Sequence, residues 1–200
     1  EKGLHFMQRF EKTKMTFREA CFDTALRLRE RTNKRLVVPI SGGSDSAIIA
    51  YVFDKLNIEH VKINQVYQFR HNILNHEEMH NLKHNMPFTC QYVQQVDVVK
   101  FAKSDFYQNI FQDMFPVQVF GSIQLNLINH EMIDPKNDFI VWGTGIPVIN
   151  RYVENYPIQY YEQGSRRFRR LGCTVLGIET TEFFEENPII NAAWYDDLMK

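Results

Sequence analysis

The feature that most restricts the fold of this chain is a glycine turn between an apolar run and a helical pattern. Residues 36–40 read Leu-Val-Val-Pro-Ile, residues 41–46 read Ser-Gly-Gly-Ser-Asp-Ser, and apolar residues recur at helical spacing over 47–53. A short buried strand that enters a helix through a tight glycine turn is typical of alternating β and α structure. The chain is therefore expected to build its fold around a parallel sheet.

The turn itself has the composition of a phosphate site. Gly42 and Gly43 allow the main chain to take positive φ values and to approach a phosphate with no Cβ in the way. Hydroxyls that can donate to phosphate oxygens belong to Ser41, Ser44 and Ser46. Asp45 would repel a bare phosphate, so its presence indicates Mg²⁺ between the carboxylate and the phosphate. The pattern predicts a nucleotide bound with its metal, although an N-cap on an ordinary tight turn would show the same residues.

Ser-Gly-Gly-x-Asp-Ser after a first strand resembles the pyrophosphate loop of the N-type ATP pyrophosphatases. This group includes asparagine synthetase, NAD synthetase, GMP synthetase and the tRNA lysidine and thiouridine enzymes. The resemblance implies ATP and Mg²⁺ as cofactors and cleavage of ATP between the α and β phosphates. AMP would be attached to a substrate carboxylate or carbonyl oxygen, and a nitrogen nucleophile would then displace it. The identity is motif-sized, while the order of strands and helices fits from about Phe17 to Ile178.

The competing phosphate motif, Gly-x4-Gly-Lys-Ser/Thr, is absent from the sequence. Phosphoryl chemistry of the Walker kind at the γ phosphate therefore has no support.

The resemblance also implies roles for individual residues. Asp45 would hold Mg²⁺ and act with Ser46 on the phosphates. The main chain around Ile63 and Asn64, expected at the end of the second strand, would recognise adenine. The phosphate cradle itself would consist of Ile40, Ser41, Gly42, Gly43, Ser44, Asp45 and Ser46.

A second glycine turn, Gly143-Thr144-Gly145, follows the short apolar run Phe139-Ile140-Val141-Trp142. It is similar to the Gly-Thr-Gly of NAD synthetase, which helps to hold ATP or the adenylated substrate. The NAD synthetase pattern continues with Asn and then Ser-Glu, whereas this chain continues Ile-Pro-Val-Ile-Asn-Arg over 146–151. The identity of the substrate stays open, and a plain strand-ending turn fits these residues equally well.

Arginines are concentrated in the last third of the chain, where residues 166–170 read Arg-Arg-Phe-Arg-Arg. Guanidinium groups match phosphate oxygens, so Arg166 and Arg167 are candidates to stabilise the departing pyrophosphate. Arg151 is a single-residue alternative for that role. The cluster Arg166–Arg170 also fits tRNA or another polyanion, and it fits a solvated basic helix face.

Apolar periodicity and turn residues divide the chain into alternating elements. Helices are expected at 17–29, 47–53, 74–85, 98–115, 117–133 and 180–200, the last interrupted at Pro188, and strands at 36–40, 59–67, 88–96, 138–142 and 173–178. This alternation predicts a doubly wound α/β fold with about five parallel strands, similar to the Rossmann-like adenine-nucleotide α-hydrolase fold. In such sheets the ligand binds at the carboxyl ends of the strands, where both glycine turns fall.

Length and composition fit one α/β domain. The chain has 200 residues, 44% of them hydrophobic, and a formal net charge of −1. A single domain over 1–200 is expected, with a helical lead-in over 1–34 and a helical segment over 180–200. Balanced charge argues against binding nucleic acid with the whole surface. The sequence shows no membrane-spanning run and no signal segment. A cytoplasmic enzyme with a small-molecule substrate and a separate ammonia-supplying glutaminase is expected.

Three alternatives stay open. A sulfur transferase acting on a nucleobase or tRNA would share the loop and use Cys90 or Cys173 as a reactive thiol, although small buried hydrophobes describe both cysteines too. His76-Glu77-x-x-His80 matches the zinc peptidase pattern, but the helix around it is almost wholly polar, which favours an exposed helix. A non-catalytic module would bind ATP through the loop without turning it over.

Overall fold

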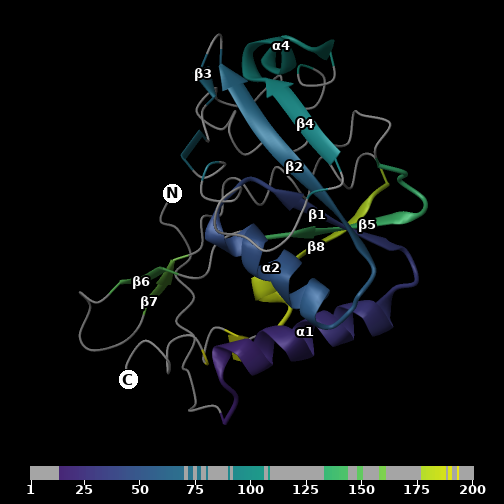
Figure 1. Cartoon of the computed structure of the whole chain (residues 1–200), viewed down its shortest axis with the longest axis vertical. Coiled ribbons are helices and arrows are strands. Elements are labelled where there is room, and N and C mark those ends of the chain that lie inside the picture. Colours follow the sequence, from purple (N-terminus) through teal and green to yellow (C-terminus); the bar gives the residue numbers. More distant parts are fainter. Residues whose placement is uncertain are drawn as a thin grey trace.

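The chain folds as an α/β structure around a parallel sheet in the computed structural model (Figure 1). The structure describes residues 14–69, 72–73, 76–77, 80, 90, 92–105, 108, 133–143, 148–150, 158–160, 177–187, 189–190 and 193. The helices are α1 (Phe17–Arg31), α2 (Ser44–Lys55), α4 (Val98–Ala102) and the short 3-10 helix η3 (Phe183–Glu185). The strands are β1 (Arg35–Ile40), β2 (His60–Phe69), β3 (Asn72–Ile73), β4 (Tyr92–Asp97), β5 (Asp138–Trp142), β6 (Val148–Asn150), β7 (Ile158–Tyr160) and β8 (Glu179–Glu182).

The order of the strands shows how the sheet is wound. The parallel strands lie side by side as β4-β2-β1-β5-β8, and β3 adds to β2 in the antiparallel direction. Numbered along the chain, the five parallel strands follow the order 3-2-1-4-5, which is the order of doubly wound folds. The predicted fold class is confirmed. The order reverses between β1 and β5, so these two strands flank the switch point of the sheet.

Strand β1 forms the centre of the sheet because its residues are apolar and buried on both faces. Leu36, Val38 and Ile40 point into a hydrophobic cluster that includes residues of α1 and α2. Val37 points the other way and is also fully buried. Continuous apolar strands of this kind are typical of parallel sheets covered on both sides.

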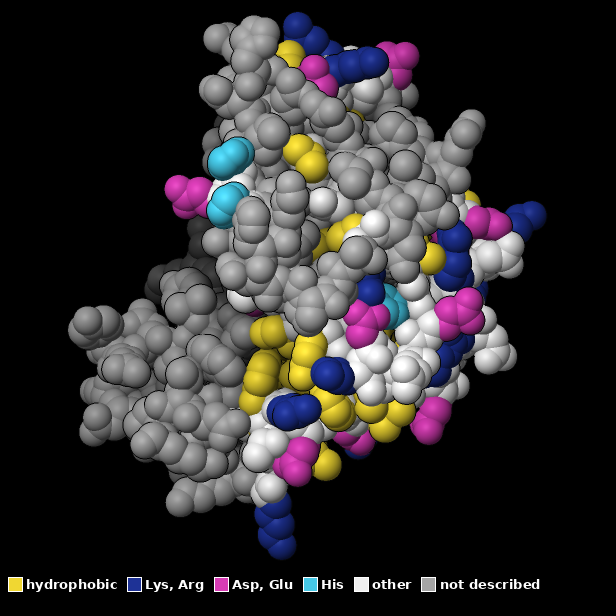
Figure 2. All heavy atoms as spheres, viewed as in Figure 1, with side chains coloured by type: hydrophobic (Ala, Val, Ile, Leu, Met, Phe, Trp, Pro, Cys, Tyr) yellow, Lys and Arg dark blue, Asp and Glu magenta, His cyan; other side chains and the backbone are white. Residues whose placement is uncertain are grey.

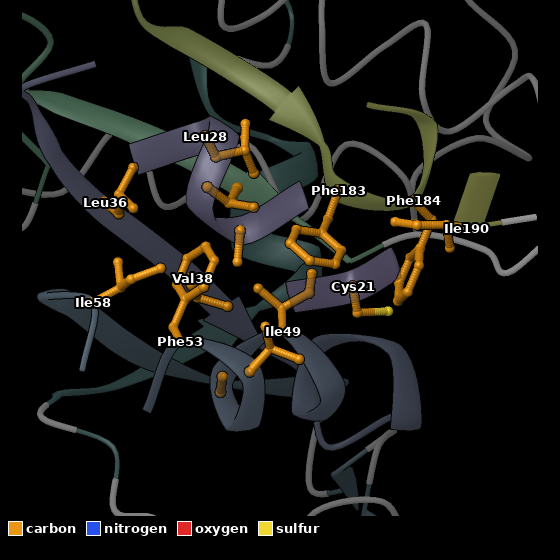
Figure 3. Packing of buried hydrophobic residues seen from close by; sticks show 14 of the residues in the cluster. Cys21, Leu28, Leu36, Val38, Ile49, Phe53, Ile58, Phe183, Phe184 and Ile190 are labelled. Atoms are coloured by element: carbon orange, nitrogen blue, oxygen red, sulfur yellow. The ribbon is translucent and has the colours of Figure 1, made fainter. Parts of the chain in front are cut away.

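Helices α1 and α2 cover one face of the sheet, and the chain after β8 folds back over the same core. Phe53 of α2 meets Phe183 edge to face, with ring centroids 6.1 Å apart, and Phe184 stacks on Phe17 of α1. Figure 3 shows Phe53, Phe183 and Phe184 gathered between the helices and the strands. Burial of this apolar surface holds α2, and with it the turn that precedes α2, against the sheet.

An ion pair between the partly exposed Arg35 and the buried Asp138 joins the amino ends of the two central strands. Arg35 of β1 lies opposite Asp138 of β5. Its Nε and Nη2 atoms each donate to one carboxylate oxygen at 2.7 Å. The Asp138 carboxylate also accepts from the backbone N–H of Asp134 at 2.8 Å. This bidentate pair secures the edge of the sheet that lies away from the glycine turns.

The carboxyl edge of the sheet is stepped. Strand β1 ends at Ile40, which lies opposite Asn64, whereas β2 continues to Phe69. Strand β4 accompanies β2 in this extension, with Asp97 opposite Gln68. Figure 1 shows β2 and β4 running together beyond the end of β1 towards α4. The glycine turn after β1 therefore lies beside β2 and β4, which both extend further than β1 at this edge.

Most predicted elements in the described part of the chain are present. The first helix and the strands at 36–40, 59–67 and 138–142 are confirmed within two residues, and the loop helix is longer than expected at both ends. The third strand is β4, which begins four residues later than predicted and extends through Asp97. The antiparallel pair of β6 and β7 was not expected from the sequence.

The predictions for the C-terminal part need correction. The last parallel strand is β8 over 179–182, because Gly177 takes a positive φ of 69° and forms a turn where a strand was expected to end. Thr180–Glu182 are therefore extended and not helical, and Phe183–Glu185 form a 3-10 turn. The sequence Glu-Thr-Thr-Glu lacks the apolar run expected of an inner strand, which suits the outer position of β8 in the described sheet.

The helix predicted over 98–115 is interrupted: α4 ends at Ala102 with Lys103 as its C-cap, and Asp105 and Gln108 are helical again. The helix predicted over 74–85 is described only at His76, Glu77 and His80, which are helical. The predictions over 117–132 and 171–176 lie outside the described residues.

Candidate functional site

The predicted phosphate loop joins β1 to α2 at the switch point of the sheet. Gly42 has a φ of 93°, a conformation that residues with a side chain rarely adopt. Gly43 returns to an extended conformation, with φ −71° and ψ 159°, and is the N-cap of α2. A Cβ on Gly43 would find its nearest neighbour, the Ser41 hydroxyl, at 3.7 Å. The space above this residue is therefore open, as a phosphate cradle requires.

Helix α2 begins without a side-chain cap, which distinguishes it from the other two α-helices that the structure defines. Helix α1 has a complete capping box of Thr16 and Glu19. The Asp97 carboxylate accepts from two backbone N–H groups of α4. The N-cap of α2 is a glycine with no such bond. The first N–H groups of this 12-residue helix therefore have no side-chain acceptor, which is the arrangement that binds anions.

The side chains of the first turn of α2 are arranged around the open N-terminus. The hydroxyl of Ser46 donates to the Gly43 carbonyl at 3.2 Å, which closes the turn. The hydroxyl of Ser44 donates to Oδ1 of Asp45 at 3.2 Å and orients that carboxylate. The Asp45 side chain is partly exposed in the first turn, where the helix dipole favours a negative charge.

Among the residues described, Asp45 belongs to no larger cluster of metal ligands. No group of three or more His, Cys, Asp or Glu side chains in the described ranges is placed to bind a metal ion. Mg²⁺ often has one or two carboxylate ligands and completes its octahedron with water and substrate phosphates. Asp45 thus fits Mg²⁺ that arrives with a polyphosphate, and it does not fit a metal bound by the protein alone.

The end of β5 packs directly against the first turn of α2. A Cβ on Gly143 would lie 2.8 Å from both the Cα and the backbone N of Ser46 and 2.9 Å from Cδ1 of Ile49. Real Cβ atoms do not approach other atoms this closely. Gly143 is therefore required to be glycine, and the fold brings the two predicted glycine turns into contact at Ser46.

Ile63 and Asn64 lie beside the loop, although their place in the strand differs from the prediction. Both residues are in the middle of β2, because this strand continues to Phe69. Ile63 pairs with Pro39 and Tyr92, and Asn64 pairs with Ile40 and Val93. Their main chains are thus flanked by strands on both sides. The expectation that their main chain would be available to recognise adenine is not supported by this arrangement.

Several predicted site residues lie outside the part of the chain that the structure describes. They are Thr144 and Gly145 of the second turn, Arg151, the cluster Arg166–Arg170 with Arg166 and Arg167, and Cys173. Their roles as nucleotide, pyrophosphate or polyanion contacts stay predictions.

Cys90 lies just before β4, which is separated from β1 and the phosphate loop by β2. Cys90 precedes β4, whose first residue pairs with Ile63, so it lies towards the amino end of the sheet. It packs against the hydrophobic cluster, and burial raises the pKa of its thiol although the Lys62 charge opposes this. A raised pKa disfavours the thiolate that sulfur transfer needs. Cys90 therefore behaves as a small core residue.

The residues of the zinc peptidase pattern are exposed. His76, Glu77 and His80 all lie at the surface. A catalytic zinc site needs a water-excluding pocket and a third ligand, and neither is found among the described residues. The expectation of a solvent-exposed helix is confirmed for these three residues.

A buried polar cluster below the loop was missed at the level of sequence. Nζ of Lys62 donates to both carboxylate oxygens of Asp54 at 2.7 Å, and Lys62 is 6% exposed. His60 lies beside them, with its Nδ1 against the Ile58 carbonyl at 2.7 Å. Burial lowers the pKa of His60, so the imidazole is neutral at pH 7. The polar residues at 60, 62 and 64, two apart on one predicted strand, were the available signal.

On the face shown in Figure 2, the described residues form no continuous basic patch that would bind a polyanion. Figure 2 shows basic and acidic side chains interspersed among its coloured residues. None of the helices in the described ranges has the length and apolar content needed to cross a membrane.

Comparisons with known proteins give a likeness in fold to solved structures. No protein-family model matches the chain, and no curated protein matches it. Among solved structures, the fold is similar to that of an NAD+ synthetase from Burkholderia pseudomallei, with 13% identity and a TM-score of 0.41. The alignment covers 90% of this chain and 86% of that chain.

Proposed function

We propose that the chain is an ATP-dependent synthetase that binds ATP with Mg²⁺ in the Ser41–Ser46 loop and cleaves it to AMP and pyrophosphate. A carboxylate or carbonyl oxygen of a small-molecule substrate would attack the α phosphate and displace pyrophosphate. A nitrogen nucleophile would then attack the carbon that bears the adenylated oxygen and displace AMP. The supporting observation is the loop geometry. A positive-φ glycine and an uncapped helix N-terminus meet at the switch point of a doubly wound sheet.

Each residue of the loop has a separate task in this proposal. The N–H groups at the start of α2 would bind the phosphate oxygens, and the helix dipole would stabilise their charge. Asp45 would bind the Mg²⁺ that bridges the phosphates. Catalysis would rest on positioning and on neutralising the leaving pyrophosphate, so the loop needs no general base.

Cleavage between the α and β phosphates is the part of the proposal that rests on the motif. Ser-Gly-Gly-x-Asp-Ser resembles the pyrophosphate loop, and no lysine stands in the loop to reach a γ phosphate. Sulfur transfer gains no support from Cys90, which packs against the hydrophobic cluster just before β4.

The experiment is to incubate the protein with ATP, Mg²⁺ and pooled metabolites or RNA and to identify the nucleotide products. The expected products are AMP and pyrophosphate, and they should form only when the pool contains the substrate. ADP and phosphate would contradict the proposal. Bound ATP with no turnover in any pool would identify a nucleotide-binding module instead.

A further inference from the structure

A buried hydrogen-bond acceptor lies at the level of the phosphate loop. The Oδ1 atom of Asn64 is buried, and no donor among the described residues reaches it. Buried polar atoms in native proteins nearly always have a partner in the protein or in ordered solvent. An acceptor left alone beside a candidate ligand site therefore indicates a donor that the bound ligand supplies.

The position of Asn64 directs its side chain towards the α2 side of the sheet. Side chains alternate along a strand, so Asn64 shares a face with His60 and Lys62. These two residues contact α2, His60 through the ring of Phe53 and Lys62 through Asp54. Asn64 lies opposite Ile40, the residue directly before the loop. Adjacent strands are about 5 Å apart, so the amide lies within reach of a ligand in the loop.

The side chain is the part of Asn64 that a ligand can use. In the ladder, its main chain is flanked by β1 on one side and β4 on the other. The side-chain amide combines the acceptor Oδ1 with the donor Nδ2. A fully ionised polyphosphate has acceptors only, so it cannot supply the donor that Oδ1 needs.

We propose that the side chain of Asn64 binds a hydrogen-bond donor on the nucleoside part of a nucleotide whose phosphates occupy the loop. This inference rests on the proposed function. Two groups on the nucleoside have the required chemistry, namely the amino group of adenine and a ribose hydroxyl. Each places an acceptor next to its donor, which matches the paired atoms of an amide.

The first test compares a nucleotide with a ligand that has no nucleoside. Binding of ATP and of inorganic tripolyphosphate, each with Mg²⁺, is measured by calorimetry for the wild type and for Asn64→Leu. Loss of the amide contact is expected to weaken ATP about tenfold and to leave tripolyphosphate unchanged. Asn33→Leu is the matched control, because Asn33 is exposed ahead of β1 and should change neither affinity. If Asn64→Leu does not fold, Asn64→Ala gives the same comparison without added bulk.

The outcomes separate this inference from the proposed function. An equal loss for both ligands, or no loss for either, overturns the role of Asn64 while the loop stays a phosphate site. A wild-type protein that binds neither ligand overturns the proposed function and the inference together.

The second test identifies the donor. ITP has an oxygen acceptor in place of the amino group of ATP, and 2′-deoxy-ATP and 3′-deoxy-ATP each lack one hydroxyl. A wild-type preference for ATP over one of these ligands that disappears in Asn64→Leu assigns the missing group as the donor. Equal affinity of the wild type for all four nucleotides overturns the proposal, because Oδ1 would then contact water only.

Discussion

At the scale of single residues, the three glycines of the candidate site are glycines for different physical reasons. Gly42 needs a positive φ of 93°. Gly143 lies too close to the Ser46 main chain to have a side chain. Gly43 has an ordinary φ and room for a Cβ, so its glycine matters only when a ligand approaches. The protein alone therefore does not require glycine at position 43, whereas it does at positions 42 and 143.

The first prediction concerns the only loop side chain that carries a charge. Asp45→Ala should abolish metal-dependent turnover of ATP, because the described residues offer no cluster of three or more His, Cys, Asp or Glu ligands to hold the metal in its place. The midpoint of thermal unfolding of Asp45→Ala should stay near that of the wild type, since the Asp45 side chain is partly exposed. AMP formation is measured against Mg²⁺ concentration, with Glu30→Ala on the surface of α1 as the control. Unchanged turnover would contradict the metal role.

His60 predicts how stability depends on pH. Burial lowers the pKa of His60 from 6.5, an effect that the Ile58 carbonyl partly opposes, while the charges of Lys62 and Asp54 act in opposite directions. The unfolded chain therefore takes up this proton at a higher pH than the folded chain does. The free energy of unfolding should fall as the pH drops below 6.5 towards the lower pKa of the folded state.

Urea denaturation at about pH 7.5 and about pH 5.5 measures this loss. Between the two pH values, the free energy of unfolding of His60→Leu should fall less than that of the wild type. The exposed His76 is the control, and His76→Leu should show the same fall as the wild type. The same pH dependence in His60→Leu and in the wild type would show that other groups cause it.

At the scale of elements, the contact between the end of β5 and the first turn of α2 determines where the phosphate loop lies. Strand β1 pairs with β5 only up to Val37, two residues before Pro39. Pro39 has no N–H to donate to a ladder. Beyond this point, the close packing of Gly143 on Ser46 takes over from strand pairing in positioning the two turns.

Gly143→Ala should displace the first turn of α2. The new Cβ meets main-chain atoms of Ser46 that cannot rotate away, so a loss of about 1–3 kcal/mol in unfolding free energy is expected. The affinity for tripolyphosphate with Mg²⁺ should fall as well. Gly43→Ala is the control for stability, because its Cβ finds only an ordinary contact at 3.7 Å. Equal stability of the two variants would show that the turns are not held by this contact.

The ion pair of Arg35 and Asp138 should contribute more than the surface pairs do. Arg35→Leu leaves a carboxylate that is 1% exposed without its guanidinium. The free energy of unfolding should fall by roughly 3 kcal/mol. This is the low end of the loss expected for breaking a buried pair, because Arg35 is itself partly exposed. Arg27→Leu is the control, since its pair with Asp23 is solvent-exposed and worth about 0.5 kcal/mol. Urea denaturation compares the two variants, and similar losses would refute the difference.

The sequence predicted correctly those elements whose local pattern agrees with their long-range contacts in the fold. The β1–loop–α2 unit was predicted because an apolar run, a glycine turn and a helical period are all local features. The helix predicted from Thr180 was wrong at its start, because the polar Glu-Thr-Thr-Glu forms strand β8 through pairing with β5, a partner about 40 positions earlier. The polar face of β2 and the contact at Gly143 depend on distant segments in the same way. The alternation of polar residues at 60, 62 and 64 is a local signal, but the segments that these residues and Gly143 contact cannot be read from a local pattern.

At the scale of the whole molecule, the fold concentrates its candidate chemistry on one edge and its structural ion pair on the other. The loop, Gly143 and the extension of β2 and β4 all lie at the carboxyl edge. The bidentate pair of Arg35 and Asp138 lies at the amino edge. Changes at the amino edge should therefore affect stability, and changes at the carboxyl edge should affect binding, as in other open α/β sheets.

Helix α2 is fastened to the sheet near both of its ends. Gly143 supports its first turn, and Asp54, near its last residue, is joined to Lys62 of the neighbouring strand. A helix anchored in this way has little freedom to rock, so the anion-binding turn is assembled before any ligand arrives. Association should then be a single step whose observed rate rises linearly with ligand concentration in stopped-flow mixing. A rate that levels off at high concentration would instead reveal a slow rearrangement of the protein.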